Sequence, residues 1–231
     1  MKVIILAGGF GTRIPEYTEL IPKPMIEIGG KPILWHVMKI YEKYGFKDFY
    51  IAMGYKGEVI KKYFSKNSFG WNINLVETGE NTMTGGRIKK FKEIVGKESF
   101  MMTYGDGLSN VNIKELIEHH KKNKTIATIS VVRPPARFGV AKLDGNYVSY
   151  FKEKSKLDEG WINGGFFVMK PEIFNYIKDD QTYLEREPLE NLCKEKQLTA
   201  FKHQDFWQCV DTKKDLEKLK SLYEKNAPWL R

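Results

Sequence analysis

The most informative segment of this 231-residue chain reads Val3-Ile4-Ile5-Leu6-Ala7-Gly8-Gly9-Phe10-Gly11-Thr12-Arg13. The apolar run at its start predicts a buried strand, and the glycines predict a tight loop at the carboxyl end of that strand. Three glycines in four positions let the backbone approach a ligand and turn its N–H groups toward anionic oxygens. Thr12 and Arg13 add a hydroxyl and a fixed cation, so the segment indicates a strand that leads into a triphosphate-binding loop.

Neither of the two common nucleotide-binding loops fits this segment. It contains no G-x-G-x-x-G motif and no Lys-Ser/Thr pair of a Walker A loop, which disfavours NAD binding and ordinary ATPase chemistry. On the glycines alone, a plain strand-to-helix turn is an equally good interpretation. Lys23 favours the phosphate loop, because Pro22 and Pro24 predict an extended, stiff path that presents its ammonium group. Without the upstream loop, a solvated lysine in a proline-rich turn would be the better interpretation.

The two segments together resemble the signature of a known family. Leu-Ala-Gly-Gly-x-Gly-Thr-Arg at 6–13 and Pro-Lys-Pro-Met at 22–25 are similar to motifs of the sugar-phosphate nucleotidyltransferases, which join a nucleoside triphosphate to a phosphorylated sugar and release pyrophosphate. Further segments resemble one branch, the glucose-1-phosphate cytidylyltransferases; they are 28–36, 78–87, 104–107, 161–167 and 206–212. The resemblance covers nearly the whole chain and implies an α/β fold: a single Rossmann-like three-layer domain with a mostly parallel mixed sheet.

Length and composition agree with such a fold. The length suits one domain, residues 1–231, which we divide into a nucleotide-binding half at about 1–125 and an acceptor-binding half at about 126–231. Hydrophobic residues make up 42% of the chain, and no apolar run approaches the ~20 residues of a membrane span, so we expect a soluble protein without membrane insertion. The chain is expected to start with a core strand rather than a leader, and the two scattered cysteines, Cys193 and Cys209, favour a reduced, cytoplasmic protein without a zinc site.

The net charge of +9 favours anionic ligands. Nucleic acid is one such ligand, but basic pairs such as Lys61-Lys62 and Lys121-Lys122 fall in helical stretches, and the sequence contains no known nucleic-acid module. Solvated helix faces are the better interpretation, so we expect no nucleic acid partner.

Strand-like and helix-like segments alternate, which is typical of a mostly parallel sheet covered by helices on both sides. Strands are expected near 2–7, 48–52, 73–77, 98–103 and 126–131, and helices near 34–44, 57–64, 112–122 and 213–225. The second half adds strand-like runs near 138–143, 147–152, 162–169 and 198–203. Asp144-Gly145-Asn146 predicts a tight hairpin turn between the first two of these runs.

Two aspartates are candidate metal ligands. Asp106 follows the apolar run 100–103 at the carboxyl end of a predicted strand, where ligands collect in open α/β sheets, although a plain Asp-Gly turn explains it when it is taken alone. Asp211 precedes the predicted C-terminal helix, so helix capping and metal ligation are both open. By resemblance, the two aspartates hold Mg²⁺ between the α-phosphate and the acceptor phosphate, and Mg²⁺ commonly uses one or two carboxylates together with phosphate oxygens and water.

The resemblance also implies a reaction. An oxygen of a sugar 1-phosphate attacks the α-phosphorus of CTP in line, pyrophosphate leaves, and no enzyme nucleophile is needed, so positioning and charge neutralisation provide the catalysis. Arg13, Lys23 and Asp106 are the expected catalytic residues. The expected nucleotide-binding residues are Leu6, Ala7, Gly8, Gly9, Phe10, Gly11, Thr12, Arg13, Lys23, Thr82, Arg87 and Gly105.

Recognition of the base and of the acceptor is implied by the resemblance alone. Segment 82–87 is the branch-specific signal for CTP, with glycines that permit close approach to the base; alternatively, Gly85-Gly86 simply begins the helix that contains Arg87. An ion pair on an exposed strand is the better interpretation of Glu153-Lys154 when the pair is taken alone. The acceptor-binding residues that the resemblance implies are Tyr104, Glu153, Lys154, Asn163 and Gly164.

The chain departs from the branch in two places. Ser155 stands where the branch has proline, which leaves the sugar specificity open. Ser65 to Trp71 replaces a much longer excursion that contributes to subunit contacts in the branch, so the homo-oligomer is also in doubt and a dimer or a monomer is an alternative.

Other functions stay open on the sequence alone. The same fold and chemistry with another phosphorylated acceptor, or with UTP or dTTP, is the nearest alternative. A non-catalytic regulatory subunit that senses a sugar nucleotide is the alternative from a different class, and the four intact polar residues Arg13, Lys23, Asp106 and Asp211 argue against it.

Overall fold

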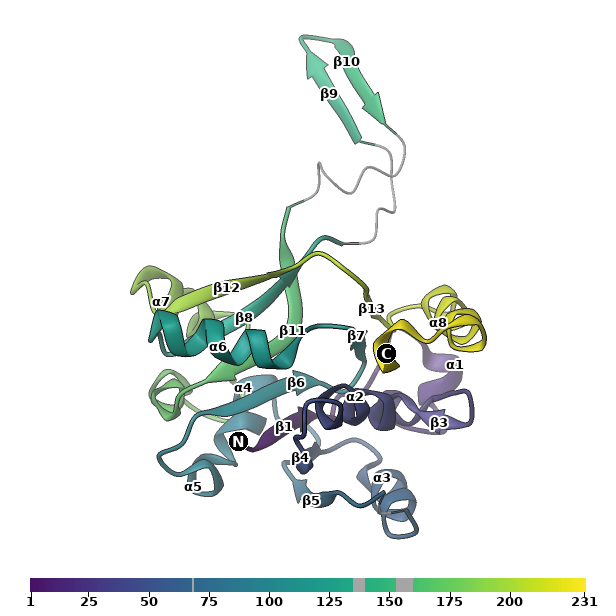
Figure 1. Cartoon of the computed structure of the whole chain (residues 1–231), viewed down its shortest axis with the longest axis vertical. Coiled ribbons are helices and arrows are strands. Elements are labelled where there is room, and N and C mark those ends of the chain that lie inside the picture. Colours follow the sequence, from purple (N-terminus) through teal and green to yellow (C-terminus); the bar gives the residue numbers. More distant parts are fainter. Residues whose placement is uncertain (68, 135–139, 153–159) are drawn as a thin grey trace.

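The computed structural model describes residues 1–67, 69–134, 140–152 and 160–231, and its centre is a seven-stranded sheet (Figure 1). The strand order is β12-β8-β11-β6-β1-β4-β5. All neighbouring pairs are parallel except those that involve β11, which runs antiparallel to both β6 and β8. The strands are β1 (Val3–Leu6), β4 (Asp48–Met53), β5 (Asn72–Glu77), β6 (Phe100–Tyr104), β8 (Ala127–Val132), β11 (Ile162–Met169) and β12 (Leu198–His203). The prediction of a mostly parallel mixed sheet is confirmed.

Helices cover both faces of the sheet and complete three layers. Alternate residues of β1 pack into two different cores: Val3 and Ile5 into one, Ile4 and Leu6 into the other. Such full burial explains why the strand reads as a continuous apolar run. The first core contains residues of α2 (Ile33–Glu42), α3 (Gly57–Phe64), α6 (Ile113–Asn123) and α8 (Lys213–Lys225). The second contains residues of α4 (Thr84–Lys89), α5 (Lys92–Val95), η2 (Pro171–Tyr176) and α7 (Glu187–Lys194).

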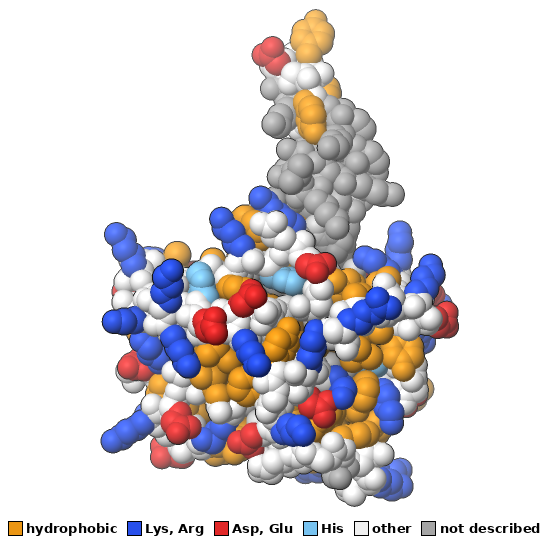
Figure 2. Space-filling view, in the orientation of Figure 1, with side chains coloured by type: hydrophobic (Ala, Val, Ile, Leu, Met, Phe, Trp, Pro, Cys, Tyr) orange, Lys and Arg blue, Asp and Glu red, His pale blue; other side chains and the backbone are white. Residues whose placement is uncertain are grey.

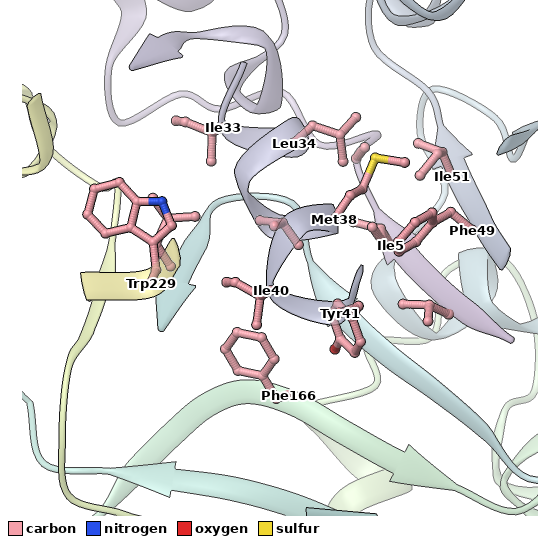
Figure 3. Packing of buried hydrophobic residues seen from close by; sticks show 14 of the residues in the cluster. Ile5, Ile33, Leu34, Met38, Ile40, Tyr41, Phe49, Ile51, Phe166 and Trp229 are labelled. Atoms are coloured by element: carbon pink, nitrogen blue, oxygen red, sulfur yellow. The ribbon is translucent and has the colours of Figure 1, made fainter. Parts of the chain in front are cut away.

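Helix α2 lies at the middle of the first core, as Figure 3 shows. Met38 and Tyr41 point toward the sheet, where Phe49 and Phe166 are also fully buried. Met38, Phe49 and Phe166 each contribute roughly 1.5–3 kcal/mol through the apolar surface they remove from water.

The C-terminal segment is anchored to α2 by a buried histidine. His36 is fully buried, its Nε2 lies 2.8 Å from the carbonyl oxygen of Ile28, and the indole Nε1 of Trp229 donates to its Nδ1 at 3.1 Å. Burial lowers the pKa of His36 to about 4. The ring is therefore neutral at neutral pH, and its second nitrogen is free to accept the bond from Trp229, which lies in η3 (Pro228–Leu230).

The predicted long elements are all present, with ends shifted by a few residues. The first two of the four strands added in the second half form a hairpin, β9 (Val140–Asp144) and β10 (Tyr147–Lys152), in which Asp144 pairs with Tyr147 and Gly145 adopts φ +58°. The expectation of a strand at 138–143 falls in part outside the described residues. The prediction missed several short elements, because a few residues show no measurable periodicity. Besides α5, α7, η2 and η3, these are α1 (Pro15–Thr18), η1 (Lys23–Met25), β2 (Glu27–Ile28), β3 (Lys31–Pro32), β7 (Gly107–Ser109) and β13 (Trp207–Cys209).

The start of α8 shows whether Asp211 caps this helix, which the sequence left open. Thr212, not Asp211, is the N-cap: its hydroxyl accepts from the backbone of Asp215, and the Asp215 carboxylate accepts from the backbone of Thr212. This reciprocal capping box accounts for the helix start. Asp211 therefore lies outside the helix, with its side chain available for other contacts.

The basic side chains seen on the surface in Figure 2 do not form a nucleic-acid-binding stripe, in line with the expectation that they lie on solvated helix faces. In the view of Figure 2, Lys and Arg side chains are scattered and alternate with acidic ones, rather than gathered into one stripe. Among the helices of the described residues, none is long and apolar enough to span a membrane.

Candidate active site

A pocket of about 790 Å³ opens at the carboxyl ends of the parallel strands. Its lining comes from the loop after β1, the turn after β5 and the residues that follow β6, which is the edge where ligands collect in open α/β sheets. The predicted site residues that line it are Leu6, Ala7, Gly8, Gly9, Phe10, Gly11, Thr12, Arg13, Lys23, Thr82, Arg87, Tyr104, Gly105, Asp106, Asn163 and Asp211. Residues from distant parts of the sequence thus converge on one cavity.

The glycine loop after β1 leaves its backbone donors open. Among the described residues, none accepts a hydrogen bond from the backbone N–H groups of residues 8–13, whereas the neighbouring N–H groups of Ala7 and Ile14 are paired. A Cβ at Gly9 would meet nothing within 4 Å, while Gly11 adopts φ +66°. A loop with free N–H groups and open space beside it is suited to an anion such as a phosphate.

Lys23 is held in a short turn rather than in the extended path that the flanking prolines predicted. Residues 23–25 form the 3₁₀ helix η1, which Pro22 precedes in extended conformation. Pro24 fits because a missing N–H is tolerated in the first turn of a helix. Lys23 is also buried, with only 6% of its surface exposed.

Asp106 and Asp211 are brought together by two short strands that the sequence did not reveal. β7 follows Asp106, β13 precedes Asp211, and the two strands pair antiparallel with Cys209 opposite Gly107. The backbone N–H of Val210 also donates to the carbonyl oxygen of Asp106 at 3.0 Å. Two carboxylates that are far apart in the sequence therefore stand side by side.

Lys23 joins these two carboxylates. Its Nζ lies 2.7 Å from Oδ2 of Asp106 and 3.0 Å from Oδ1 of Asp211, and Arg13 contacts the other oxygen of Asp211 at 2.6 Å. Burial by itself would lower the pKa of Lys23, but the two carboxylates outweigh burial and raise it. Burial likewise opposes ionisation of Asp211, but Lys23 and then Arg13 hold its pKa below the usual range. Lys23 and Asp211 are therefore both charged at neutral pH.

Cys209 lies beside this network as a free thiol. Its Sγ donates to Oδ2 of Asp211 at 3.4 Å, and burial together with the two aspartates raises its pKa to about 12. The thiol therefore stays protonated at neutral pH and is not a thiolate nucleophile.

Gly85 and Gly86 begin helix α4, as the alternative interpretation had it. A Cβ at Gly86 would lie 2.5 Å from Cα of Asp180, and one at Gly85 would lie 2.7 Å from the carbonyl oxygen of Thr182. The backbone N–H groups of both glycines donate to that same carbonyl. The two glycines thus permit a close approach of the segment 180–184 to the start of the helix.

The other side of the pocket carries polar side chains from β6, β11 and the segment before α7. The hydroxyl of Tyr104 donates to Glu185 at 2.5 Å, and Nδ2 of Asn163 donates to the same hydroxyl at 3.3 Å. Asn163 sits beside an irregularity in β11, where Gly165 adopts φ +82°, and such bulges commonly redirect side chains at active sites. Gly164 lies next to Asn163, and its carbonyl accepts from the indole of Trp207 at 2.7 Å.

Sequence reasoning missed part of the lining. Glu185 was not singled out, since it carries no local motif and meets Tyr104 only through the fold. Other lining residues that were not predicted are Glu80, Met83, Thr84, Tyr183, Trp207 and Gln208. The predicted acceptor residues Glu153 and Lys154, and the departure at Ser155, lie outside the described residues.

Comparison with known proteins finds similar proteins over nearly the whole chain. The family model described as nucleotidyl transferase matches residues 2–227. A glucose-1-phosphate cytidylyltransferase of Salmonella typhi is 46% identical over 253 aligned positions, covering 99% of this chain and 98% of the relative. A probable glucose-1-phosphate cytidylyltransferase of Bacillus subtilis is 43% identical and covers 99% of this chain and 96% of the relative.

Solved structures share the fold at lower identity. A putative glucose-1-phosphate thymidylyltransferase from Bacillus anthracis, solved with sucrose, has a TM-score of 0.76 at 22% identity, covering 97% of this chain and 96% of the other. HddC from Yersinia pseudotuberculosis, solved with GMP-PN, has a TM-score of 0.75 at 27% identity, covering 96% of this chain and 99% of the other.

Proposed function

This chain belongs to the nucleotidyl transferase family, and we propose that it transfers a cytidylyl group from CTP to α-D-glucose 1-phosphate, giving CDP-glucose and pyrophosphate. The full-length similarity to glucose-1-phosphate cytidylyltransferases supports the choice of nucleotide and acceptor. The single structural observation that carries the proposal is the contact of Lys23 with both Asp106 and Asp211 at the mouth of the glycine loop.

The two carboxylates fit a divalent ion. Asp106 and Asp211 both reach one Nζ atom, so their oxygens converge on a volume that a single cation can occupy. In the described residues no group of three or more His, Cys, Asp or Glu side chains forms a metal cage. Two carboxylates suffice for Mg²⁺, which keeps several waters and takes phosphate oxygens as further ligands. When bound, Mg²⁺ would neutralise charge on the phosphates of both substrates.

The residues of the chain have distinct tasks in this proposal. The open N–H groups of the glycine loop receive the triphosphate, and Arg13 and Lys23 turn from the aspartates to the phosphates. Both cations then balance the charge that develops on the leaving pyrophosphate, which is the electrostatic part of catalysis. The attacking oxygen already belongs to a phosphate, so no side chain has to remove a proton from it.

The acceptor side is proposed to hold the sugar. Tyr104 and Asn163 present hydroxyl and amide groups toward the remaining part of the pocket, and Glu153, Lys154 and Gly164 complete the set by resemblance. Thr82 lines the opposite side, where the base of the nucleotide would lie.

A substrate panel tests the assignment. Purified protein is incubated with Mg²⁺ and each of CTP, UTP, dTTP, GTP and ATP against glucose 1-phosphate, mannose 1-phosphate and galactose 1-phosphate, and pyrophosphate release is measured. We expect the highest kcat/KM for CTP with glucose 1-phosphate. Preference for UTP or dTTP would assign another branch, and Mg²⁺-dependent CTP binding without turnover on any acceptor would assign a regulatory role.

A further inference from the structure

Arg87 is a buried cation without an acidic partner. It lies in α4 with 4% of its surface exposed, and among the described residues no carboxylate forms an ion pair with it. Burial accordingly lowers its pKa. Burying a charge in this way is costly unless hydrogen bonds compensate for the lost water. The cost points to a role that requires the guanidinium at this place.

The terminal nitrogens of Arg87 are saturated by protein acceptors. Nη1 donates to the carbonyl oxygens of Met53 at 3.1 Å and Gly79 at 2.7 Å, and to the hydroxyl of Thr78 at 2.7 Å. Nη2 donates to the carbonyl oxygens of Gly8 at 2.9 Å and Glu80 at 3.0 Å. The two nitrogens carry four N–H groups between them, and five acceptors share those groups. None of these four terminal N–H groups is left over for a nucleotide.

These acceptors come from three strand ends. Gly8 follows β1, Met53 ends β4, and residues 78–80 follow β5, so one guanidinium ties the first residue of the glycine loop to two neighbouring edges of the pocket. The bond between the Tyr55 N–H and the Gly8 carbonyl, at 3.1 Å, strengthens the same junction. A planar group with several fixed donors suits such a junction better than a flexible ammonium group does.

Two glycines make room for the guanidinium. A Cβ at Gly8 would lie 2.3 Å from Nη1 of Arg87, and a Cβ at Gly54 would lie 2.5 Å from the same atom. The first glycine of the loop is therefore needed for Arg87, while Gly9 remains open for a ligand. The loop and the guanidinium are fitted to each other.

We propose that Arg87 is a positioning residue that fixes the glycine loop against the 78–80 turn before the nucleotide arrives, rather than a residue that touches the nucleotide. The proposal rests on the proposed function only in taking the loop to be a triphosphate site. A loop that is already ordered does not pay an ordering cost when its ligand binds, so the arginine raises affinity without contact. Its effect is then independent of the base, because it acts on the part of the pocket that receives the phosphates.

The test compares two probes on the intact protein by calorimetry: CTP, and inorganic tripolyphosphate, which has no base or sugar. Arg87→Lys keeps the charge and removes the planar fork, and Thr78→Val removes one acceptor as a milder change. We expect Arg87→Lys to weaken both probes by about tenfold, and Thr78→Val to weaken both by a smaller, similar factor. Trp229→Phe, which deletes a buried hydrogen bond at His36 instead, is the control for lost stability and should leave both affinities unchanged.

Three outcomes would overturn the proposal: unchanged affinities in Arg87→Lys and Thr78→Val with only a lower melting temperature, a loss for CTP but not for tripolyphosphate, or failure of the wild-type protein to bind either probe. If Arg87→Lys does not fold, Thr78→Val alone decides between the first two. Failure of the proposed function is recognised separately, as wild-type binding of the probes without pyrophosphate release from CTP.

Discussion

Arg87 and Lys23 are both buried cations of one pocket, yet the fold holds them in opposite ways. Arg87 lies among neutral carbonyl and hydroxyl oxygens, whereas Lys23 lies between two carboxylates. A cation held by neutral acceptors has no anion to exchange, but a cation held by carboxylates can pass to a phosphate while a divalent ion takes its place. The two parts of the pocket therefore differ. The part held by Arg87, which we call the fixed floor, keeps its contacts when a ligand binds, whereas the contacts of Lys23 with Asp106 and Asp211 can be exchanged for a phosphate and a divalent ion.

Removal of Lys23 should have the largest effect on activity, because Lys23 is the cation that we expect to pass from the carboxylates to the phosphates. We expect Lys23→Ala to lower turnover by at least about 100-fold, as loss of one charge-stabilising donor commonly does. The melting temperature should change much less, because Arg13 still contacts Asp211. Pyrophosphate release and thermal melting are measured together, and Lys178→Ala serves as the control, since it removes an exposed pair with Glu187 away from the pocket. Normal turnover in Lys23→Ala would end the assignment of the site.

Binding of Mg²⁺ in the absence of nucleotide tests whether the ion takes the place of the Lys23 ammonium group between the two carboxylates. In the wild-type protein Mg²⁺ must compete with Lys23 for the carboxylates, so calorimetry with Mg²⁺ alone should show weak binding. Lys23→Ala should bind Mg²⁺ alone about tenfold more tightly, or ~1.4 kcal/mol. The double variant Lys23→Ala with Asp106→Asn should lose this gain. Equal Mg²⁺ affinity in the wild-type protein and in Lys23→Ala would show that the lysine does not occupy the place of the ion.

The fixed floor is tested by two neighbouring glycines. Gly8→Ala places a methyl group 2.3 Å from the guanidinium and should lower the free energy of unfolding by about 1–3 kcal/mol, the usual cost of overpacking. Gly9→Ala meets nothing within 4 Å and should leave stability within about 0.5 kcal/mol of the wild-type value, while weakening CTP binding because its methyl group fills the open side of the loop. Chemical denaturation and calorimetry measure the two effects. Equal stability losses in both variants would contradict the fitted arrangement at Gly8.

The sequence was sufficient for elements with a strong local pattern. The buried strand β1, the amphipathic helices and the hairpin turn at Gly145 each carry their signal within a few residues, and the structure confirms them. The glycine loop and Asp106 carry local signals at strand ends, and Lys23 was singled out by its flanking prolines; the structure places all of them in the lining of one pocket.

The features that could not be predicted from the sequence depend on contacts between segments that are distant in the chain. β7 and β13 are three residues each and form by pairing with one another, so the sequence of neither strand carries a local signal that predicts it. The saturation of Arg87 depends on acceptors from three strand ends, and the resemblance alone suggested direct nucleotide binding instead. The role of Glu185 at Tyr104 is likewise visible only once the segment before α7 is placed.

The smallest predicted effect concerns the hydrogen bond between Trp229 and His36, two residues that do not line the pocket. The variant Trp229→Phe therefore serves as the control for the variants in the pocket. Trp229→Phe removes the donor to Nδ1 of His36 and should lower the free energy of unfolding by about 1 kcal/mol at neutral pH, without a change in KM for CTP. Burial holds the pKa of His36 in the fold at about 4, below its ordinary value of 6.5, so its stabilising contribution is complete above about pH 6.5 and is lost as the pH falls toward 4.

The pH dependence separates this hydrogen bond from general destabilisation. The bond requires an unprotonated Nδ1, so its removal makes protonation of His36 less costly, and the stability of Trp229→Phe should fall less steeply between pH 6.5 and pH 4 than that of the wild-type protein. The remaining slope belongs to the burial of His36 itself and to His120, whose pKa burial also lowers to about 4. Urea denaturation at several pH values measures both curves. Parallel curves would mean that the indole does not sense the charge of His36, and a raised KM for CTP would remove Trp229→Phe as the neutral reference against which the fixed and exchangeable ends of the pocket are compared.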